Sequence, residues 1–118
     1  MFIEYFRKRD KSKTILYKLS NNFTIVTSVV CYFEIFTGVK ESDLVFVNRI
    51  FRDIEVIPFN KECAFKASEI YKTLKKKNKI IEFRDIFIGA TALVYNLELS
   101  TLNRKHFERI DDIKIYDY

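Results

Sequence analysis

Two acidic residues and one amide lie where their side chains could take part in chemistry. The first is Glu34, the one charged residue in the apolar run from Val30 to Phe36. Burying an unpaired carboxylate costs several kcal/mol unless a cation or a hydrogen-bond donor compensates it. Either a partner therefore lies beside Glu34, or Glu34 faces solvent at one edge of an otherwise buried helix.

The other two candidates are Asp85 and Asn103. Asp85 precedes an apolar helical segment, and Gly89 follows one turn later on the same side, where a ligand or a backbone could approach closely. The alternative is an acid that the helix dipole favours in a first turn. Asn103 offers a neutral oxygen beside Arg104 and Lys105, although asparagine is also common in turns.

The remaining polar motifs narrow the reaction classes. His106 is the only histidine, which excludes a zinc site of several histidines and would oblige a Ser-His-Asp triad to use it. The sequence has no Gly-x-Ser-x-Gly elbow and neither of the glycine-rich phosphate-binding loops. Cys31 and Cys63 lie far apart in apolar surroundings, so core packing is favoured over a disulfide or a zinc site.

The basic residues form two clusters, one from Arg7 to Lys13 and the other from Lys72 to Lys79. Such clusters usually form the solvated outer face of a helix. The alternative is a surface that follows the phosphates of a nucleic acid, with an affinity that falls as salt rises. A formal net charge of +5 favours a polyanionic partner mildly.

In the first half of the chain, short strands alternate with helices. Two short amphipathic helices are predicted within the first 20 residues, followed by a strand at Phe23 to Thr27. Ser28 is expected to cap a helix over Val29 to Thr37, which Gly38 would end as a left-handed residue. A helix over Leu44 to Phe51 and a brief strand at Ile54 to Ile57 follow.

The second half begins with two longer helices. Asn60 is predicted to cap the first, whose buried face carries Cys63, Ala67, Ile70 and Leu74 and whose other face is rich in lysine. The second is predicted over Asp85 to Asn96. Leu97 to Leu102 and Asp112 to Tyr116 alternate in the manner of strands.

Strands separated by helices predict an α/β fold with a parallel sheet, and no linker or repeat divides residues 1–118 into more than one domain. Functional groups gather at the carboxyl ends of parallel strands, so Glu34, Asp85 and Asn103 are expected to meet at one sheet edge. No apolar stretch is long enough to span a membrane, and the start of the chain lacks the order of a signal peptide, which predicts a cytoplasmic protein.

Three stretches, in this order, carry a resemblance to a known family: Thr27 to Gly38, Arg84 to Leu93 and Thr101 to Phe107. Together they resemble the PIN-domain nucleases, most closely the VapC-type toxins of prokaryotic toxin–antitoxin pairs. The resemblance implies a three-layer fold, endoribonuclease activity and a cognate antitoxin. It also implies that Glu34 and Asp85 are ligands of Mg²⁺ or Mn²⁺, with Asn103 binding water or lying in the outer coordination shell.

The start of the chain departs from the family pattern. PIN domains usually begin with an apolar strand that ends in Asp, whereas Met1 to Phe6 resembles the segment just after that residue. Either the natural start lies upstream, or the protein is a degenerate relative. A sheet without its central strand leaves unpaired backbone groups, so a homodimer or an altered sheet is expected.

Two further expectations follow from the incomplete acidic cluster and from the first helices. The alternative to a ribonuclease is a catalytically impaired PIN domain that binds RNA or protein without turnover. The apolar faces of the two N-terminal helices could hold an antitoxin helix, or they could be core or homodimer contacts; these faces include Ile3, Phe6, Ile15 and Leu19.

Overall fold

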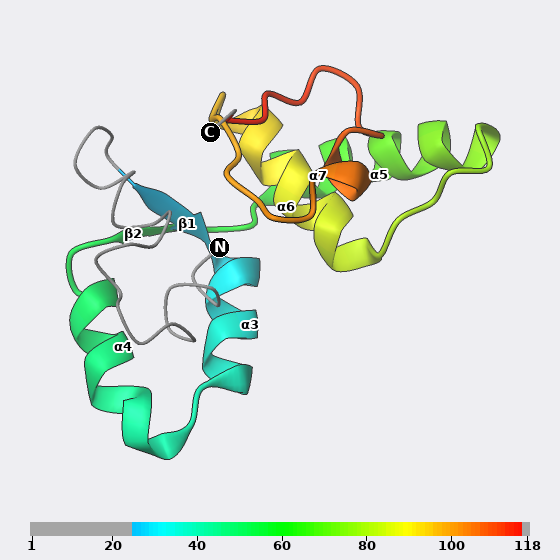
Figure 1. Cartoon of the computed structure of the whole chain (residues 1–118). Helices are drawn as coiled ribbons and strands as arrows, with labels where there is room; N and C mark the ends of the chain where they lie inside the picture. Colours follow the sequence, from blue (N-terminus) through cyan, green and yellow to red (C-terminus); the bar gives the residue numbers. More distant parts are fainter. Residues whose placement is uncertain (1–24, 117–118) are drawn as a thin grey trace. The chain divides into compact units, whose positions relative to one another are not determined.

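The computed structural model describes residues 25–116 (Figure 1). The chain divides into two compact units, Met1–Ile57 and Pro58–Tyr118. Each unit is described by itself. The predicted N-terminal helices, their four apolar residues and the first two residues of the predicted strand at Phe23 to Thr27 lie outside the described residues. No helix in residues 25–116 combines the length and apolar character needed to cross a membrane.

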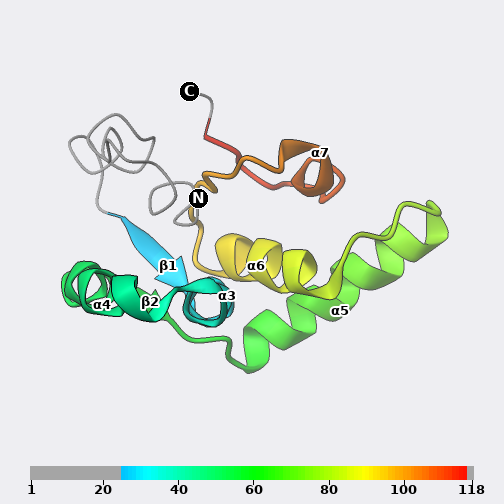
Figure 2. The ribbon, with the colours of Figure 1, turned by 60° about the horizontal axis from the view of Figure 1, so that its bottom comes forward.

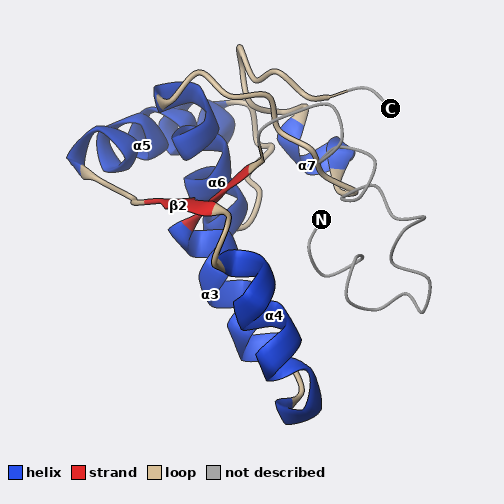
Figure 3. Cartoon of the chain, turned by 90° about the vertical axis from the view of Figure 1, so that its left-hand side faces the viewer, coloured by secondary structure: helices blue, strands red, loops and turns tan. Residues whose placement is uncertain are grey.

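The first unit is a parallel strand pair joined through helices. Its elements are β1 (Val26–Ser28), α3 (Val29–Gly38), the 3-10 helix η2 (Glu41–Asp43), α4 (Leu44–Phe51) and β2 (Glu55–Ile57). The two strands run parallel with Thr27 opposite Val56, and they lie side by side in Figure 3. The predicted strand–helix–strand alternation is confirmed here, because a parallel pair requires a crossover of this kind.

The start of α3 follows the prediction, but its end does not. The backbone N–H of Cys31 donates to Ser28 Oγ at 3.1 Å, which is the predicted N-cap. Gly38, however, lies inside the helix, and no glycine in residues 25–116 has a positive φ. The helix ends because Val39 is extended (φ −77°, ψ 132°) and packs against the core of this unit, so the prediction of a left-handed Gly38 is wrong.

The core of the first unit lies between α3 and α4. Ile35, Val47 and Phe51 are buried, and the rings of Tyr32 and Phe36 pack on Phe51 with centroids 5.1 and 5.5 Å away. Such aromatic pairs contribute about 0.5–1.5 kcal/mol beyond their buried area. The helical spacing predicted for α4 therefore places Val47 and Phe51 correctly in the core.

The second unit is built on two packed helices, α5 (Lys61–Lys76) and α6 (Phe83–Val94), followed by the short α7 (Arg104–Phe107). The helices α5 and α6 lie alongside each other (Figure 2). The N–H of Cys63 donates to Asn60 Oδ1 at 3.0 Å, which confirms the predicted cap. All four residues predicted for the buried face of α5 are buried: Cys63, Ala67, Ile70 and Leu74.

Both long helices end at asparagines that the sequence did not single out. Asn78 (φ 55°) and Asn96 (φ 54°) are left-handed. After α6, the N–H of Leu97 donates to the Ala92 carbonyl at 2.8 Å, and after α5 the N–H of Lys79 donates to the Leu74 carbonyl at 2.9 Å. These bonds are the six-to-one bonds of a Schellman motif, in which asparagine can take the place of glycine. Helix α6 consequently ends at Val94, before the predicted Asn96.

The last two predicted strands are reduced to one parallel bridge between Leu99 and Ile115. The direction of pairing is as predicted, but its extent is not. The Thr101 hydroxyl accepts a hydrogen bond from the N–H of Asn103 at 3.0 Å, which turns the chain soon after Leu99. On the other side, Asp112 is left-handed (φ 66°), so a turn replaces the predicted start of that strand.

Candidate functional site

Asp85 carries a nearly buried carboxylate in the first turn of α6. It is 6% exposed, and its own N–H donates to the Glu82 carbonyl at 3.1 Å. Helix α6 begins two residues before the predicted start at Asp85, so this acid lies within the first turn and not at its edge. The N-terminal end of the helix dipole favours a negative charge at this place.

The side chain next to this carboxylate is His106, from α7, which packs against α6 (Figure 1). His106 Nδ1 lies 3.0 Å from Asp85 Oδ2. The same ring nitrogen lies 2.9 Å from Asn103 Nδ2, at the N-cap of α7. Asp85, Asn103 and His106 therefore form one hydrogen-bonded group, which we call the Asp85 cluster.

The proton on the imidazole decides how this cluster is joined. One Nδ1 cannot donate to Asp85 and accept from Asn103 at the same time. With the proton on Nδ1 the ring donates to the carboxylate, and with the proton on Nε2 it accepts from the Asn103 amide. Because a nearly buried carboxylate needs a donor, the first arrangement is the one that satisfies Asp85.

The structure thus brings together two of the three predicted site residues, Asp85 and Asn103. Both lie next to His106, which is not among the predicted site residues. His106 was considered only as a triad or zinc residue, and neither class fitted. The signal that could have found it is the spacing of three between Asn103 and His106, which places both side chains at the start of one helical turn.

Glu34, the third predicted residue, is in the middle of α3 in the first unit and is half-buried. It is not a carboxylate without a partner, since the structure gives it an interaction of its own. Its expected meeting with Asp85 at one sheet edge stays a prediction.

The space expected above Gly89 is filled by protein. A Cβ at this position would lie 2.5 Å from Ile110 Cδ1 and 3.8 Å from Phe107 Cδ1. Gly89 and Ile110 are both buried. The close approach predicted at this glycine therefore exists, but a core side chain makes it and not a ligand.

Comparison with known proteins places this site in a family. The sequence pattern of the PIN domain matches residues 1–113, which is nearly the whole chain. The chain belongs to the PIN domain family. It is 32% identical to ribonuclease VapC1 of Methanocaldococcus jannaschii over 120 residues, a match covering 99% of this chain and 82% of that protein.

Solved structures of PIN proteins agree with this assignment. VapBC2 from Rickettsia felis, bound to a DNA fragment from its promoter, has a TM-score of 0.83 at 25% identity, covering 99% of this chain and 92% of that one. VapBC-1 from nontypeable Haemophilus influenzae has a TM-score of 0.82 at 27% identity, covering 98% and 91%. The predicted α/β PIN-like fold and the family resemblance are confirmed.

The acids of this PIN domain can be compared with what a divalent cation needs. Mg²⁺ and Mn²⁺ prefer hard oxygen ligands, and the carboxylates of Asp85 and Glu34 are donors of that type. Within residues 25–116, however, no group of three or more His, Cys, Asp or Glu residues is gathered that could hold a metal. Carboxylate oxygens are suitable ligands for these ions, but residues 25–116 alone do not provide a complete set of metal ligands.

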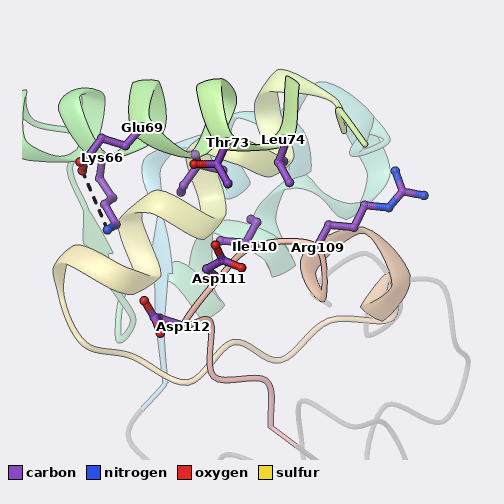
Figure 4. A pocket seen from close by; sticks show the side chains of 9 residues that line it. Lys66, Glu69, Thr73, Leu74, Arg109, Ile110, Asp111 and Asp112 are labelled. Atoms are coloured by element: carbon purple, nitrogen blue, oxygen red, sulfur yellow. Dashed lines mark ion pairs between the residues drawn. The ribbon is translucent and has the colours of Figure 1, made fainter. Parts of the chain in front are cut away.

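A separate hollow in the same unit lies between α5 and residues 109–112 (Figure 4). Its volume is about 150 Å³, well below the roughly 300 Å³ at which small-molecule pockets begin. Charges of both signs line it. Lys66 pairs with Glu69 at 3.9 Å, and Asp111 pairs at 3.5 Å with Lys77, which lies outside the lining. This hollow does not compete with the Asp85 cluster as a functional site of the PIN domain.

Proposed function

We propose that the protein is a metal-dependent endoribonuclease and the toxin component of a toxin–antitoxin pair. The observation that carries the proposal is the Asp85 cluster, a nearly buried carboxylate at a helix start in a chain of the PIN family. Relatives that match most of this chain are named ribonuclease VapC. We propose that residues 1–118 form a single domain of this kind, because the family match runs through both compact units.

In this proposal Glu34 and Asp85 hold Mg²⁺ or Mn²⁺, and Asn103 binds water or lies in the outer coordination shell. When bound, such an ion makes a coordinated water more acidic and offsets negative charge on the phosphate. The chain's own residues orient the carboxylate that would bind the ion. His106 holds Asp85 Oδ2 in place by donating from Nδ1.

The test is cleavage of a mixed RNA pool in Mg²⁺ or Mn²⁺, compared with cleavage in EDTA. Asp85→Asn is the matched variant, because the amide keeps the size of the side chain and can still accept from His106, but it loses the charge that a cation requires. We expect cleavage by the parent chain to fall at least about 100-fold in EDTA and in the variant. Cleavage that is insensitive to EDTA would contradict the proposal.

The partners belong to the same proposal. The solved structures from Rickettsia felis and Haemophilus influenzae are VapBC complexes, which supports a cognate antitoxin for this chain. We also propose a homodimer, which the exposed apolar residues of α3 support, including Phe33 at 67% exposed. The free thiols of Cys31 and Cys63 support a reducing, cytoplasmic location.

A second candidate is a PIN domain that binds RNA or protein without cleaving RNA. The observation that favours it is that residues 25–116 gather no group of three metal-binding side chains. It predicts RNA or antitoxin-peptide binding in EDTA, and no cleavage in Mg²⁺ or Mn²⁺ by a folded chain. Metal-dependent cleavage that is lost in Asp85→Asn would exclude it.

A further inference from the structure

Four aromatic rings form a continuous strip on the outside of the second unit. The ring of Phe83 packs edge-on against Tyr71 at 5.7 Å between centroids and is stacked with Phe87 at 6.5 Å. Phe59 lies 5.0 Å from Phe87. We call Phe59, Tyr71, Phe83 and Phe87 the aromatic strip. Its ring contacts link α5, α6 and the segment before α5.

Two rings of the strip are exposed, and the other two, Phe59 and Tyr71, are half-buried. Phe83 is 60% exposed and Phe87 is 36% exposed. These two residues are four apart on α6 and share a face, while Ile86 and Ala90 on another face are buried. Leaving two phenylalanine rings in water gives up the roughly 1.5–3 kcal/mol that burying each would contribute. The rings are thus available to stack with something else.

Lysines are frequent in the segment between two residues of the strip, and one of them lies against a ring. Between Tyr71 and Phe83 the sequence has five lysines and one acid, Glu82, which pairs with Arg84 at 3.2 Å. Lys75 Nζ lies 5.9 Å from the centre of the Tyr71 ring. In the described part of the chain, Lys72, Lys75 and Lys79 are exposed and make no ion pair, whereas Lys77 is paired with Asp111.

The strip begins in the same helical turn as Asp85. Phe83 and Asp85 both lie in the first turn of α6 and are separated by about 3 Å along the helix axis. Phe83 is exposed there while Asp85 is buried. Residues two apart on a helix lie about 200° apart around its axis, so the ring and the carboxylate lie on different sides of α6.

We propose that the aromatic strip binds single-stranded RNA, with bases stacked on Phe83 and Phe87 and backbone phosphates near Lys72, Lys75 and Lys79. Exposed rings flanked by unpaired cations are the arrangement that binds single strands without reading their sequence. A protein partner fits less well, since the cores of protein interfaces are depleted in lysine. The inference deepens the proposed ribonuclease function by placing the substrate on a surface.

The test is binding of a fluorescein-labelled oligouridine of about 12 nucleotides, within the site sizes of single-strand binders. Fluorescence anisotropy is measured in EDTA with Asp85→Asn as the parent chain, so that cleavage does not interfere. We expect Phe83→Ala to weaken binding about tenfold and Phe83→Leu to weaken it nearly as much, because leucine keeps the apolar surface but cannot stack. Phe83→Trp should keep the affinity.

Two controls isolate stacking and charge. Phe65→Ala removes an equally exposed ring (67%) of α5 that makes no contact with the strip, and it should leave the affinity unchanged. Replacing Lys72, Lys75 and Lys79 with Gln should make the slope of log affinity against log salt shallower by about 2, because each phosphate contact on a single strand contributes roughly 0.7 to the slope. Lys40→Gln, on the first unit, should not change this slope.

Three outcomes would overturn the inference. The parent chain does not bind RNA, or Phe83→Ala binds RNA as tightly as the parent chain, or Phe83→Ala loses affinity while Phe83→Leu keeps the full affinity of the parent chain. In the last case, light scattering that shows self-association lost in Phe83→Ala would assign the strip to a protein contact. Failure of the proposed function is seen separately, as absence of metal-dependent cleavage by the chain with its native Asp85.

Discussion

Asp85 shows how one buried charge organises its surroundings. Its carboxylate is almost withdrawn from water, and the His106 imidazole provides the donor that compensates it at 3.0 Å. Asn103 Nδ2 lies 2.9 Å from the same ring nitrogen, and it would donate to that nitrogen only in the tautomer that does not donate to Asp85. In metal sites, hydrogen-bond partners of a carboxylate fix its orientation before the ion binds.

The first prediction concerns His106. His106→Ala leaves the Asp85 carboxylate without its donor, so in EDTA we expect the free energy of unfolding to fall by about 1–3 kcal/mol. His106→Asn is the matched control, because its amide nitrogen can take the place of Nδ1 and should recover most of that loss. Thermal and urea unfolding measure both variants. Equal stability of His106→Ala and the parent chain would show that the imidazole does not support Asp85.

Asp85 and Asn103 could be found from the sequence, because each stands at a place where local signals are strong, a helix start and a turn. The role of His106 could not, since it depends on α7 packing against α6 across more than twenty residues of chain. A lone histidine has no periodicity that marks its partner. Sequence patterns identify the acid in such a pair more readily than its donor.

At the scale of elements, helix starts were predicted better than helix ends. Ser28 and Asn60 bond to a backbone N–H three residues later in the chain, so their caps are purely local. Ends depend on what the next residues pack against, which is why Gly38 did not end α3 while Asn78 and Asn96 ended the long helices. The same holds for the last two strands, where turns at Asn103 and Asp112 leave a single bridge.

The second prediction compares the two glycines. In an exposed helix position, Gly→Ala stabilises by up to about 1 kcal/mol. A Cβ at Gly38 meets nothing within 4 Å, so Gly38→Ala should stabilise or be neutral. At Gly89 the same change places Cβ against buried Ile110, and we expect a loss of about 1–3 kcal/mol from overpacking.

Urea unfolding of four variants checks this difference: Gly38→Ala, Gly89→Ala, Ile110→Val, and the double variant of Gly89 and Ile110. Ile110→Val in the Gly89→Ala background removes the clashing Cδ1 and should recover part of the loss, which a double-mutant cycle would show as coupling between the two positions. Additive effects at Gly89 and Ile110, or stabilisation by Gly89→Ala, would mean that Ile110 moves aside at no cost.

At the scale of the whole molecule, a net charge of +5 limits how two copies can meet. Like charges repel, so a homodimer needs a face without exposed cations. Helix α3 contains no Lys or Arg, and Val29 and Phe33, one turn apart, are 39% and 67% exposed. The lysines, by contrast, gather at the end of α5. Helix α3 is therefore suited to a contact with a second copy, and the end of α5 is suited to a contact with RNA.

The final prediction tests this separation. If α3 forms the dimer face, two-fold symmetry places Phe33 in the interface twice, and Phe33→Glu loses about 2–3 kcal/mol of burial per copy and adds charge. We expect light scattering at micromolar concentration to show a dimer for the parent chain and a monomer for this variant. Phe65→Glu is the control, since its ring is equally exposed but lies on α5 among lysines. A dimer that survives Phe33→Glu would move the interface away from α3, and a parent chain that is monomeric at every concentration would exclude the homodimer.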